Sequence, residues 1–535
     1  MRFTRCVLMM AVLALAATTV QAAEGLVMAD RAPAQSVAVV EIENAAGLRQ
    51  DVLASPFWKA LQNTEAVRQW KASERYAQGQ QHLEEFLKRL EMDEDTAMET
   101  YLGGTSALVL LDSGDPKKPY GVFLTEVARA DAERLIKAAG AHEVGRRGGV
   151  PIWEVQKESR LDRMAYAGGV LMLTRPRADE LQQVLDVATG QEAALGTEGH
   201  FHKAVDELPD GWRIRAYAAQ VPPRKTPGAV ALYPQGDDRV HAEWRIVSGA
   251  GDVGPNRPVV LHGADCLPDS AVAAVTTCFH PKAIWEMVQE EMADRADGEE
   301  KIRRAKMFVR GWFPGHPMDG IVSAFGPEAA GALVKGEDGS APGLVGMARL
   351  TASGRPVAHA FKDGLAAKAM MFGALGQKRE KPIIVNVREE TYNNASILII
   401  EAPEVLQKFL GDWAKDVALT VAIADDWMIV GTTPAGVKRT IDTAAGNGRS
   451  LADAMKEVGE RVPDEPVTRW GVVRPAEGSD IVLAWAEKLL GHQRVEQAKH
   501  MTNLAEVMDL VKRFIWQRTD EPDVIRGTAD VQVVD

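Results

Sequence analysis

The chain has 535 residues, of which 26% are charged, and its formal net charge at pH 7 is −13 with histidine counted as neutral. This length allows more than one domain with a hydrophobic core of its own. The acidic balance argues against general nucleic-acid binding and against binding to anionic lipid surfaces, because both require attraction to negative charge.

The first residues have the pattern of a secretory signal peptide. Arg2 and Arg5 precede an apolar run over 6–20, and the small residues Ala22 and Ala23 follow it. We therefore expect a signal peptide over 1–23 and a mature chain that is periplasmic or extracellular; an uncleaved signal anchor is the alternative. No other stretch approaches ~20 uninterrupted apolar residues, so we expect no transmembrane segment after cleavage.

After the leader, the sequence predicts strands interspersed with helices. An apolar run over 34–42 predicts a strand, and 56–101 predicts a long helical region. A strand over 120–126 and a helix over 130–140 follow. This mixture favours an α+β fold with a mainly antiparallel sheet and helices packed on one face.

A strand, a two-residue turn, a second strand and a helix then follow, and this hairpin–helix unit occurs twice, at 165–190 and 421–446. The first turn is Gly168 and Gly169, and two glycines between apolar runs favour a tight hairpin because both can adopt positive φ. The second turn is Asp425 and Asp426. Aspartate adopts positive φ less readily, so the sequence supports this turn less strongly.

The helix of each unit carries start and stop signals and one apolar stripe. Each helix has a proline in its first turn, a nearby threonine as candidate N-cap and a glycine at its end, which are Pro176, Thr174 and Gly190 in the first copy and Pro434, Thr433 and Gly446 in the second. At helical spacing, one stripe consists of Leu181, Val184, Leu185 and Ala188 in the first copy. The other consists of Val437, Ile441 and Ala444 in the second copy.

Further landmarks recur in the same order in both halves, among them the pairs Phe57-Trp58 and Ile284-Trp285. We therefore predict two related units, at 33–250 and 268–535, joined by a Gly- and Pro-rich linker at 251–267. The second unit carries helical insertions around 350–400 and 475–520. Two units are too few for a solenoid.

Several of these segments resemble a secreted bacterial family catalogued as domain of unknown function 3352. The resemblance rests on Pro33 with 36–40, Pro268 with 269–275, the pair Phe57-Trp58 and the hairpin–helix unit. It would cover most of the mature chain. It implies no activity, cofactor or catalytic residue that could be carried over.

The mature chain has two cysteines, Cys266 and Cys278. In an oxidising compartment they could pair as a disulfide. Cys278 lies at the end of an apolar run over 271–279, so a buried thiol on a strand is the alternative.

Two local patterns contain residue types used in binding sites. Residues 248–254 contain the pattern G-x-G-x-x-G, but prolines follow where a dinucleotide site requires a helix, which favours a linker. Glu198, His200 and His202 are possible metal ligands. Two glycines in that stretch favour a surface loop, and no second cluster completes a coordination shell.

Other candidates have plainer interpretations. His241 and Glu243 alternate on a predicted strand and fit a solvated strand face. The twelve tryptophans are dispersed and fit core packing better than a binding groove. The sequence contains no H-E-x-x-H, no G-x-S-x-G and no Walker A loop, so we assign no catalytic, cofactor-binding or metal-binding residue.

These observations favour an exported, non-catalytic binding or structural protein of the periplasm or cell envelope, whose partner is an unknown envelope protein or a small apolar ligand. One alternative is a carrier with an internal pocket between sheet and helices, lined by residues such as Leu83, Phe86, Leu171 and Leu181. The other is an envelope hydrolase with a noncontiguous site.

Overall fold

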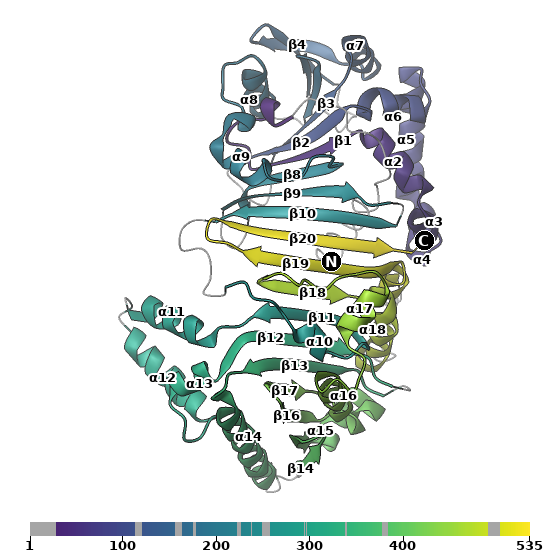
Figure 1. Ribbon diagram of the computed structural model, residues 1–535. Helices are drawn as coiled ribbons and strands as arrows, with labels where there is room; N and C mark the ends of the chain where they lie inside the picture. Colours follow the sequence, from purple (N-terminus) through teal and green to yellow (C-terminus); the bar gives the residue numbers. More distant parts are fainter. Residues whose placement is uncertain are drawn as a thin grey trace. The chain divides into compact units, whose positions relative to one another are not determined.

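The computed structural model describes residues 28–112, 120–155, 163–174, 178–221, 226–236, 238–248, 257–293, 295, 297–337, 340–376, 384–490 and 503–534 (Figure 1). The predicted signal peptide lies outside these residues. The described residues form two compact units: the first contains those up to 248 together with those from 521 onward, and the second contains those from 257 to 520.

The first unit is built on a sheet in which all neighbouring strands are antiparallel. In spatial order these strands are β4 (His142–Arg147), β5 (Val150–Glu154), β6 (Arg163–Ala167), β7 (Val170–Thr174), β3 (Tyr120–Glu126), β2 (Thr105–Leu111), β1 (Ala38–Glu43), β8 (Ile214–Val221), β9 (Thr226–Pro234), β10 (Arg239–Val247) and β20 (Val524–Val533). The earliest strand, β1, therefore lies inside the sheet, and β20 pairs along the whole of β10.

The helices of the first unit are mostly short. They are η1 (Met28–Arg31), α2 (Ala45–Ala54), α3 (Pro56–Gln62), α4 (Glu65–Lys71), α5 (Glu74–Leu90), α6 (Glu94–Leu102), α7 (Arg129–Ala138), α8 (Ala178–Ala188), η2 (Leu195–Thr197) and α9 (Gly199–Val205). The predicted helical region over 56–101 is thus four helices. Ser73 and Asp93 begin α5 and α6, because each side chain accepts a hydrogen bond from the first turn of the helix that it precedes, whereas Thr64 precedes α4 without such a bond.

Strand β7 separates two hydrophobic clusters. Its residues alternate between the faces of the sheet, so Leu171 packs with α7 while Met172 packs with α8. Helices therefore cover both faces here, which corrects the prediction that they cover one. All five residues of β7 are buried, and a strand buried on both sides carries a continuous apolar run instead of an alternating one.

The second unit is built on a second antiparallel arrangement. In spatial order its strands are β14 (Asn386–Tyr392), β15 (Ala395–Glu401), β16 (Leu419–Ala424), β17 (Trp427–Gly431), β13 (Gly343–Leu350), β12 (Phe325–Val334), β11 (Ala271–Cys278), β18 (Arg469–Val473) and β19 (Val511–Asp520).

The helices of the second unit also lie on both faces of its sheet. They are α10 (Gly263–Cys266), α11 (Pro281–Ala293), α12 (Gly298–Arg310), α13 (Met318–Ser323), α14 (Gly354–Gly376), α15 (Pro403–Leu410), η3 (Gly411–Lys415), α16 (Pro434–Ala444), α17 (Leu451–Glu457) and α18 (Pro475–Leu490). Val437 and Ile441 of α16 pack against Ile429, whereas Ala366 of α14 packs against Leu398 on the other face.

The predicted α+β fold with an antiparallel sheet is confirmed. Both two-residue hairpins are also confirmed, since Ala167 pairs with Val170 and Ala424 pairs with Trp427. Gly168 and Gly169 have φ values of 57° and 84°, and Asp425 has a φ of 45°. Asp425 therefore adopts the left-handed conformation that the turn requires.

The helix signals hold in the second copy. Pro434 begins α16, and the side chain of its N-cap, Thr433, accepts a hydrogen bond from the backbone of Gly436. In the first copy Thr174 ends strand β7 instead, and Pro176 lies outside the described residues. Gly190 and Gly446 both have positive φ after the ends of their helices.

The division into units differs from the predicted one at the end of the chain. Residues from 521 onward belong with the first unit, whereas the sequence places them in the second. The strand orders of the units correspond, from β4–β5–β6–β7–β3–β2–β1–β8–β9 to β14–β15–β16–β17–β13–β12–β11–β18–β19. Descent of both units from one copied module stays a prediction.

Candidate functional site

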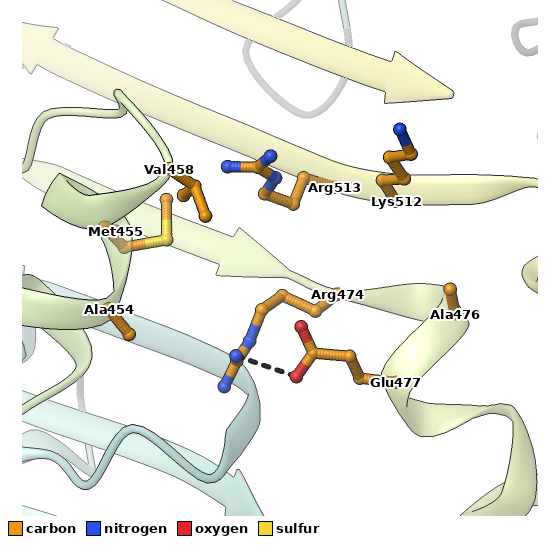
Figure 2. A pocket seen from close by; sticks show the side chains of 8 residues that line it. All are labelled: Ala454, Met455, Val458, Arg474, Ala476, Glu477, Lys512 and Arg513. Atoms are coloured by element: carbon orange, nitrogen blue, oxygen red, sulfur yellow. Dashed lines mark ion pairs between the residues drawn. The ribbon is translucent and has the colours of Figure 1, made fainter. Parts of the chain in front are cut away.

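A pocket of about 230 Å³ lies within the second unit (Figure 2). Its lining comes from α17 and the residue after it (Ala454, Met455 and Val458), from the junction of β18 with α18 (Arg474, Ala476 and Glu477), and from the start of β19 (Lys512 and Arg513). Strands β18 and β19 pair so that Val473 lies opposite Phe514. This register brings Arg474 and Arg513 to the same pocket.

Arg474 is held firmly at one side of the pocket. Its side chain is buried, and its Nε donates to the backbone oxygen of Ala271 at 2.9 Å. It also donates to the backbone oxygen of Asp269. Its Nη1 lies 2.7 Å from Oε2 of Glu477, which is exposed. The guanidinium of Arg474 thus links the beginning of β11 to the first turn of α18.

Arg513 forms the opposite side. Figure 2 shows it extending from β19 toward Met455 and Val458. Its Nη1 lies 3.7 Å from Oε1 of Glu460, and both side chains are largely buried. The neighbouring Lys512 is partly exposed. Three cations therefore face two carboxylates around this pocket, a small local positive excess in an acidic chain.

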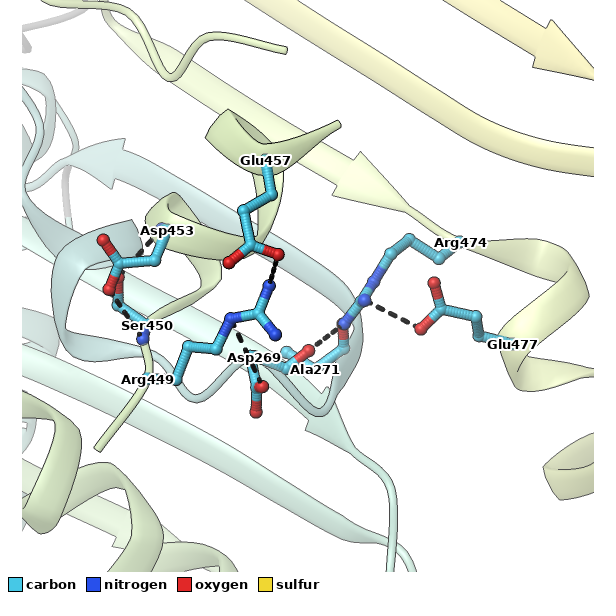
Figure 3. Close-up of polar contacts among 8 residues, drawn as sticks. All are labelled: Asp269, Ala271, Arg449, Ser450, Asp453, Glu457, Arg474 and Glu477. Atoms are coloured by element: carbon cyan, nitrogen blue, oxygen red, sulfur yellow. Dashed lines mark hydrogen bonds and ion pairs between the residues drawn. The ribbon is translucent and has the colours of Figure 1, made fainter. Parts of the chain in front are cut away.

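A set of polar contacts fixes the α17 wall (Figure 3). Ser450 and Asp453 form a reciprocal capping box at the start of α17. The Ser450 hydroxyl bound to Asp453 lowers the pKa of that carboxyl. Arg449 pairs with Glu457, and its Nε lies 3.9 Å from Oδ2 of Asp269, whose backbone oxygen Arg474 also contacts. The two walls are therefore anchored to the same residue.

This arrangement suits binding. Met455 and Val458 offer an apolar wall, while Arg474, Lys512 and Arg513 supply positive charge that attracts an anionic group. Among the described residues, the lining contains no serine, cysteine or histidine, so these residues offer none of the common nucleophiles with a neighbouring base.

The predicted metal-ligand stretch has a different local structure from the expected loop. Glu198 is the N-cap of α9, and His200 and His202 lie on that helix. Residues two apart on a helix do not share a face. His202 Nδ1 lies 2.9 Å from Oδ1 of Asp206, and this hydrogen bond raises the pKa of His202. Within the described residues, no three His, Cys, Asp or Glu are arranged to hold a metal ion.

His241 is bound on both sides, unlike the solvated residue that the sequence predicts. Its Nδ1 lies 2.7 Å from Oδ1 of Asp530 on β20, and its Nε2 lies 3.1 Å from Oε1 of Glu243. The hydrogen bond to Asp530 raises the pKa of His241 against the effect of burial, and Glu243 adds to it. When protonated, His241 donates to both carboxylates and has no free lone pair with which to act as a base.

The two cysteines are free thiols. Cys278 is buried at the end of β11, as the alternative interpretation predicts, and its Sγ donates to the backbone oxygen of Val467 at 3.2 Å. Burial raises the pKa of Cys266 to about 12 and that of Cys278 to about 11. Thiols with such values are poor nucleophiles at neutral pH.

Sequence patterns gave no sign of a buried carboxyl on β12. Glu328 is 1% exposed, and its Oε1 accepts from the backbone N–H groups of His262 at 2.8 Å and Gly263 at 2.5 Å. Burial raises the pKa of Glu328. The rest of the β12 sequence is typical of a core strand, so only the three-dimensional structure shows that Glu328 is buried.

The residues proposed to line an internal carrier pocket are divided between separate clusters. Leu171 packs with α7 on one face of the sheet, and Leu181 packs on the other, and both are fully buried. Phe86 packs at the edge of the Leu171 cluster. This packing argues against the carrier alternative. Of the G-x-G-x-x-G stretch, only Ser248 lies among the described residues.

The prediction that the tryptophans pack in the core holds for four of them, while six others whose burial the structure describes are only partly buried. Trp285, Trp413, Trp427 and Trp470 are buried, whereas Trp70 is exposed. Within the part of the chain that the structure describes, no helix combines the length and the apolarity needed to cross a bilayer.

These features define a class of protein: an α+β chain of two units with a small pocket that is partly apolar and partly charged. No protein-family model matches the chain, and no curated protein matches it. Two solved structures, crystal forms I and III of TP0453, are similar at 6% identity over 42% of this chain and 80% of that chain, each with a TM-score of 0.24. A likeness this weak carries no argument about fold or function. The resemblance to domain of unknown function 3352 therefore stays a prediction.

Proposed function

We propose that this chain is an exported, non-catalytic binding protein of the periplasm or cell envelope. Its ligand is a small molecule with one anionic group and a short apolar part. The observation that carries the proposal is the convergence of Arg474, Lys512 and Arg513 on one pocket beside Met455.

The fixed geometry of this pocket supports a binding role. Arg474 is held by two backbone oxygens and by Glu477, so its position is already set before a ligand arrives. Groups that are already ordered lose less conformational freedom on binding. The export signal in the sequence supports the location, because the leader combines an arginine-flanked apolar run with small residues.

Native mass spectrometry of the chain purified from its own cell envelope tests the proposal. We expect a co-purifying small molecule with an acidic group. R513Q should remove it or weaken it by roughly tenfold, because one charge-assisted hydrogen bond contributes about 1.5–3 kcal/mol.

R388Q is the matched control. Arg388 lies on β14 of the same unit, outside the pocket, and also pairs with glutamates. Equal retention of the small molecule by R513Q and R388Q would contradict a binding role for this pocket.

A further inference from the structure

The ends of two helices in the second unit expose large apolar side chains. Met307 and Phe308 lie on α12, and a second group lies near the end of α14. The α14 group is Met370, Met371, Phe372 and Leu375. All six side chains are between 53% and 70% exposed. Clustered exposed apolar side chains of this size mark an interaction surface in a folded protein.

The two groups belong to neighbouring parts of the fold. Lys368 of α14 donates to the backbone oxygen of Gly311, which follows α12, and its Nζ lies 4.1 Å from the ring centre of Trp312. Phe308 lies one turn before this junction on α12, and Phe372 lies one turn after Lys368 on α14. We call Met307, Phe308, Met370, Met371, Phe372 and Leu375 the apolar tip.

Packing within the unit does not account for the apolar tip. In the last two turns of α14, Gly373 is the buried position, facing Val385, while its neighbours on the other sides are exposed. An amphipathic core helix would place polar residues at those exposed positions. Helix α14 has 23 residues but is not apolar enough to cross a bilayer, because it carries Arg355, Lys362, Asp363 and Lys368. An apolar helix end of this kind suits insertion into a membrane interface.

Helix α12, which carries Met307 and Phe308, has an excess of positive charge. Helix α12 contains five lysines and arginines but two glutamates. Two of its cations are paired, Lys301 with Asp297 and Arg304 with Glu300. Arg303 and Arg310 are exposed on the same helix, and Lys368 adds a cation at the junction. This local excess contrasts with the net charge of −13 for the whole chain.

This charge distribution indicates what kind of partner binds the apolar tip. We propose that the apolar tip and the cations of α12 bind the surface of a bilayer that contains anionic headgroups. Cations attract the headgroups, while phenylalanine and methionine side chains enter the apolar boundary beneath them. A second copy of the chain is a poorer match, because an isologous contact would bring two positive surfaces together. The local charge thus overrides the argument from net charge against anionic lipids.

Co-sedimentation of the purified full chain with vesicles tests this inference. We expect binding to vesicles of equal parts phosphatidylglycerol and phosphatidylcholine, and at least about tenfold weaker binding to phosphatidylcholine alone. Binding should fall in about 0.5 M salt, where the Debye length is only a few ångströms. No binding to the anionic vesicles would overturn the proposal.

Two pairs of variants separate the apolar and charge contributions. F308S/F372S should weaken binding by about tenfold or more, since two large apolar side chains no longer leave water. W70S is its control, because Trp70 is 57% exposed, belongs to the first unit and is not part of the apolar tip. R303Q/R310Q should weaken binding to the anionic vesicles only, and R75Q, on exposed α5, should not.

The outcomes are distinct from those of the pocket experiment. Equal vesicle binding by the wild type and F308S/F372S would overturn the membrane proposal. A wild-type dimer that becomes a monomer in F308S/F372S without vesicles would show instead that the apolar tip joins two copies, and it would also overturn the proposal. Loss of the small molecule in R513Q bears on the pocket alone.

Discussion

At the scale of single residues, His241 shows how a strand pattern can hide a charged contact. Its position on β10 matches the expected alternation, but Asp530 comes from a strand almost 300 residues later. No local signal in the sequence relates these two residues. The same is true of the pocket, where Arg474 and Arg513 meet only because β18 and β19 pair in one register.

The raised pKa of His241 predicts a pH dependence of stability. Because the folded-state pKa lies above the unfolded value of about 6.5, the contribution is fully present below that value. It is lost as the pH rises through the folded-state pKa. We expect roughly 1 kcal/mol, since the side chain is only partly shielded from water.

Urea denaturation across this pH range measures the effect. H241Q should lack this decline, whereas H82Q, at an exposed position of α5, should keep it. A wild-type profile identical to that of H241Q would contradict the assignment.

At the scale of elements, the hairpin–helix unit is the part that the sequence predicts best. Gly168 and Gly169 favour a two-residue turn because both adopt positive φ readily, so this prediction does not depend on contacts with residues far away in the sequence. The sequence led us to expect helices on one face of the sheet only, although the unbroken apolar run of β7 indicates that both faces are covered. The sequence predicted a loop where α9 follows Glu198, because the two glycines in this stretch usually interrupt helices.

Two glycines with open space around them should respond oppositely to alanine. Gly169 has a φ of 84° and Gly79 lies inside α5, and neither would bring an added Cβ within 4 Å of another group. G169A should destabilise by about 1–2 kcal/mol, because alanine disfavours positive φ. G79A should stabilise by about 0.5–1 kcal/mol, because alanine is the better helix former.

Thermal or urea unfolding of both variants measures the difference directly. The two substitutions add the same methyl group, so the opposite signs isolate the backbone conformation. A stabilising G169A would show that the turn does not need the left-handed region.

At the scale of the whole molecule, the sequence predicts the number of units but misplaces one boundary. The similarity between 238–246 and 523–531 suggests equivalent strands of two units, yet β10 and β20 pair with each other in the first. Pairing partners cannot be deduced from similarity, because two edge strands of the same pattern fit either sheet.

Removal of residues 521–535 should therefore damage the first unit. It would leave β10 paired with β9 alone, with one edge open along its whole length, and would remove the buried Ile525. We expect faster amide hydrogen exchange in β10 and a lower unfolding midpoint for the first unit. Exchange in β15 and β16 of the second unit should change little. Unchanged protection of β10 would contradict this pairing.

The late position of β20 also has a consequence for biogenesis. A ribosome delivers every residue of the second unit before it delivers the strand that completes the first. During vectorial synthesis, β10 must therefore wait with one open edge while 253–520 emerges. A holding chaperone, or delayed closure after release, would protect that edge during the interval.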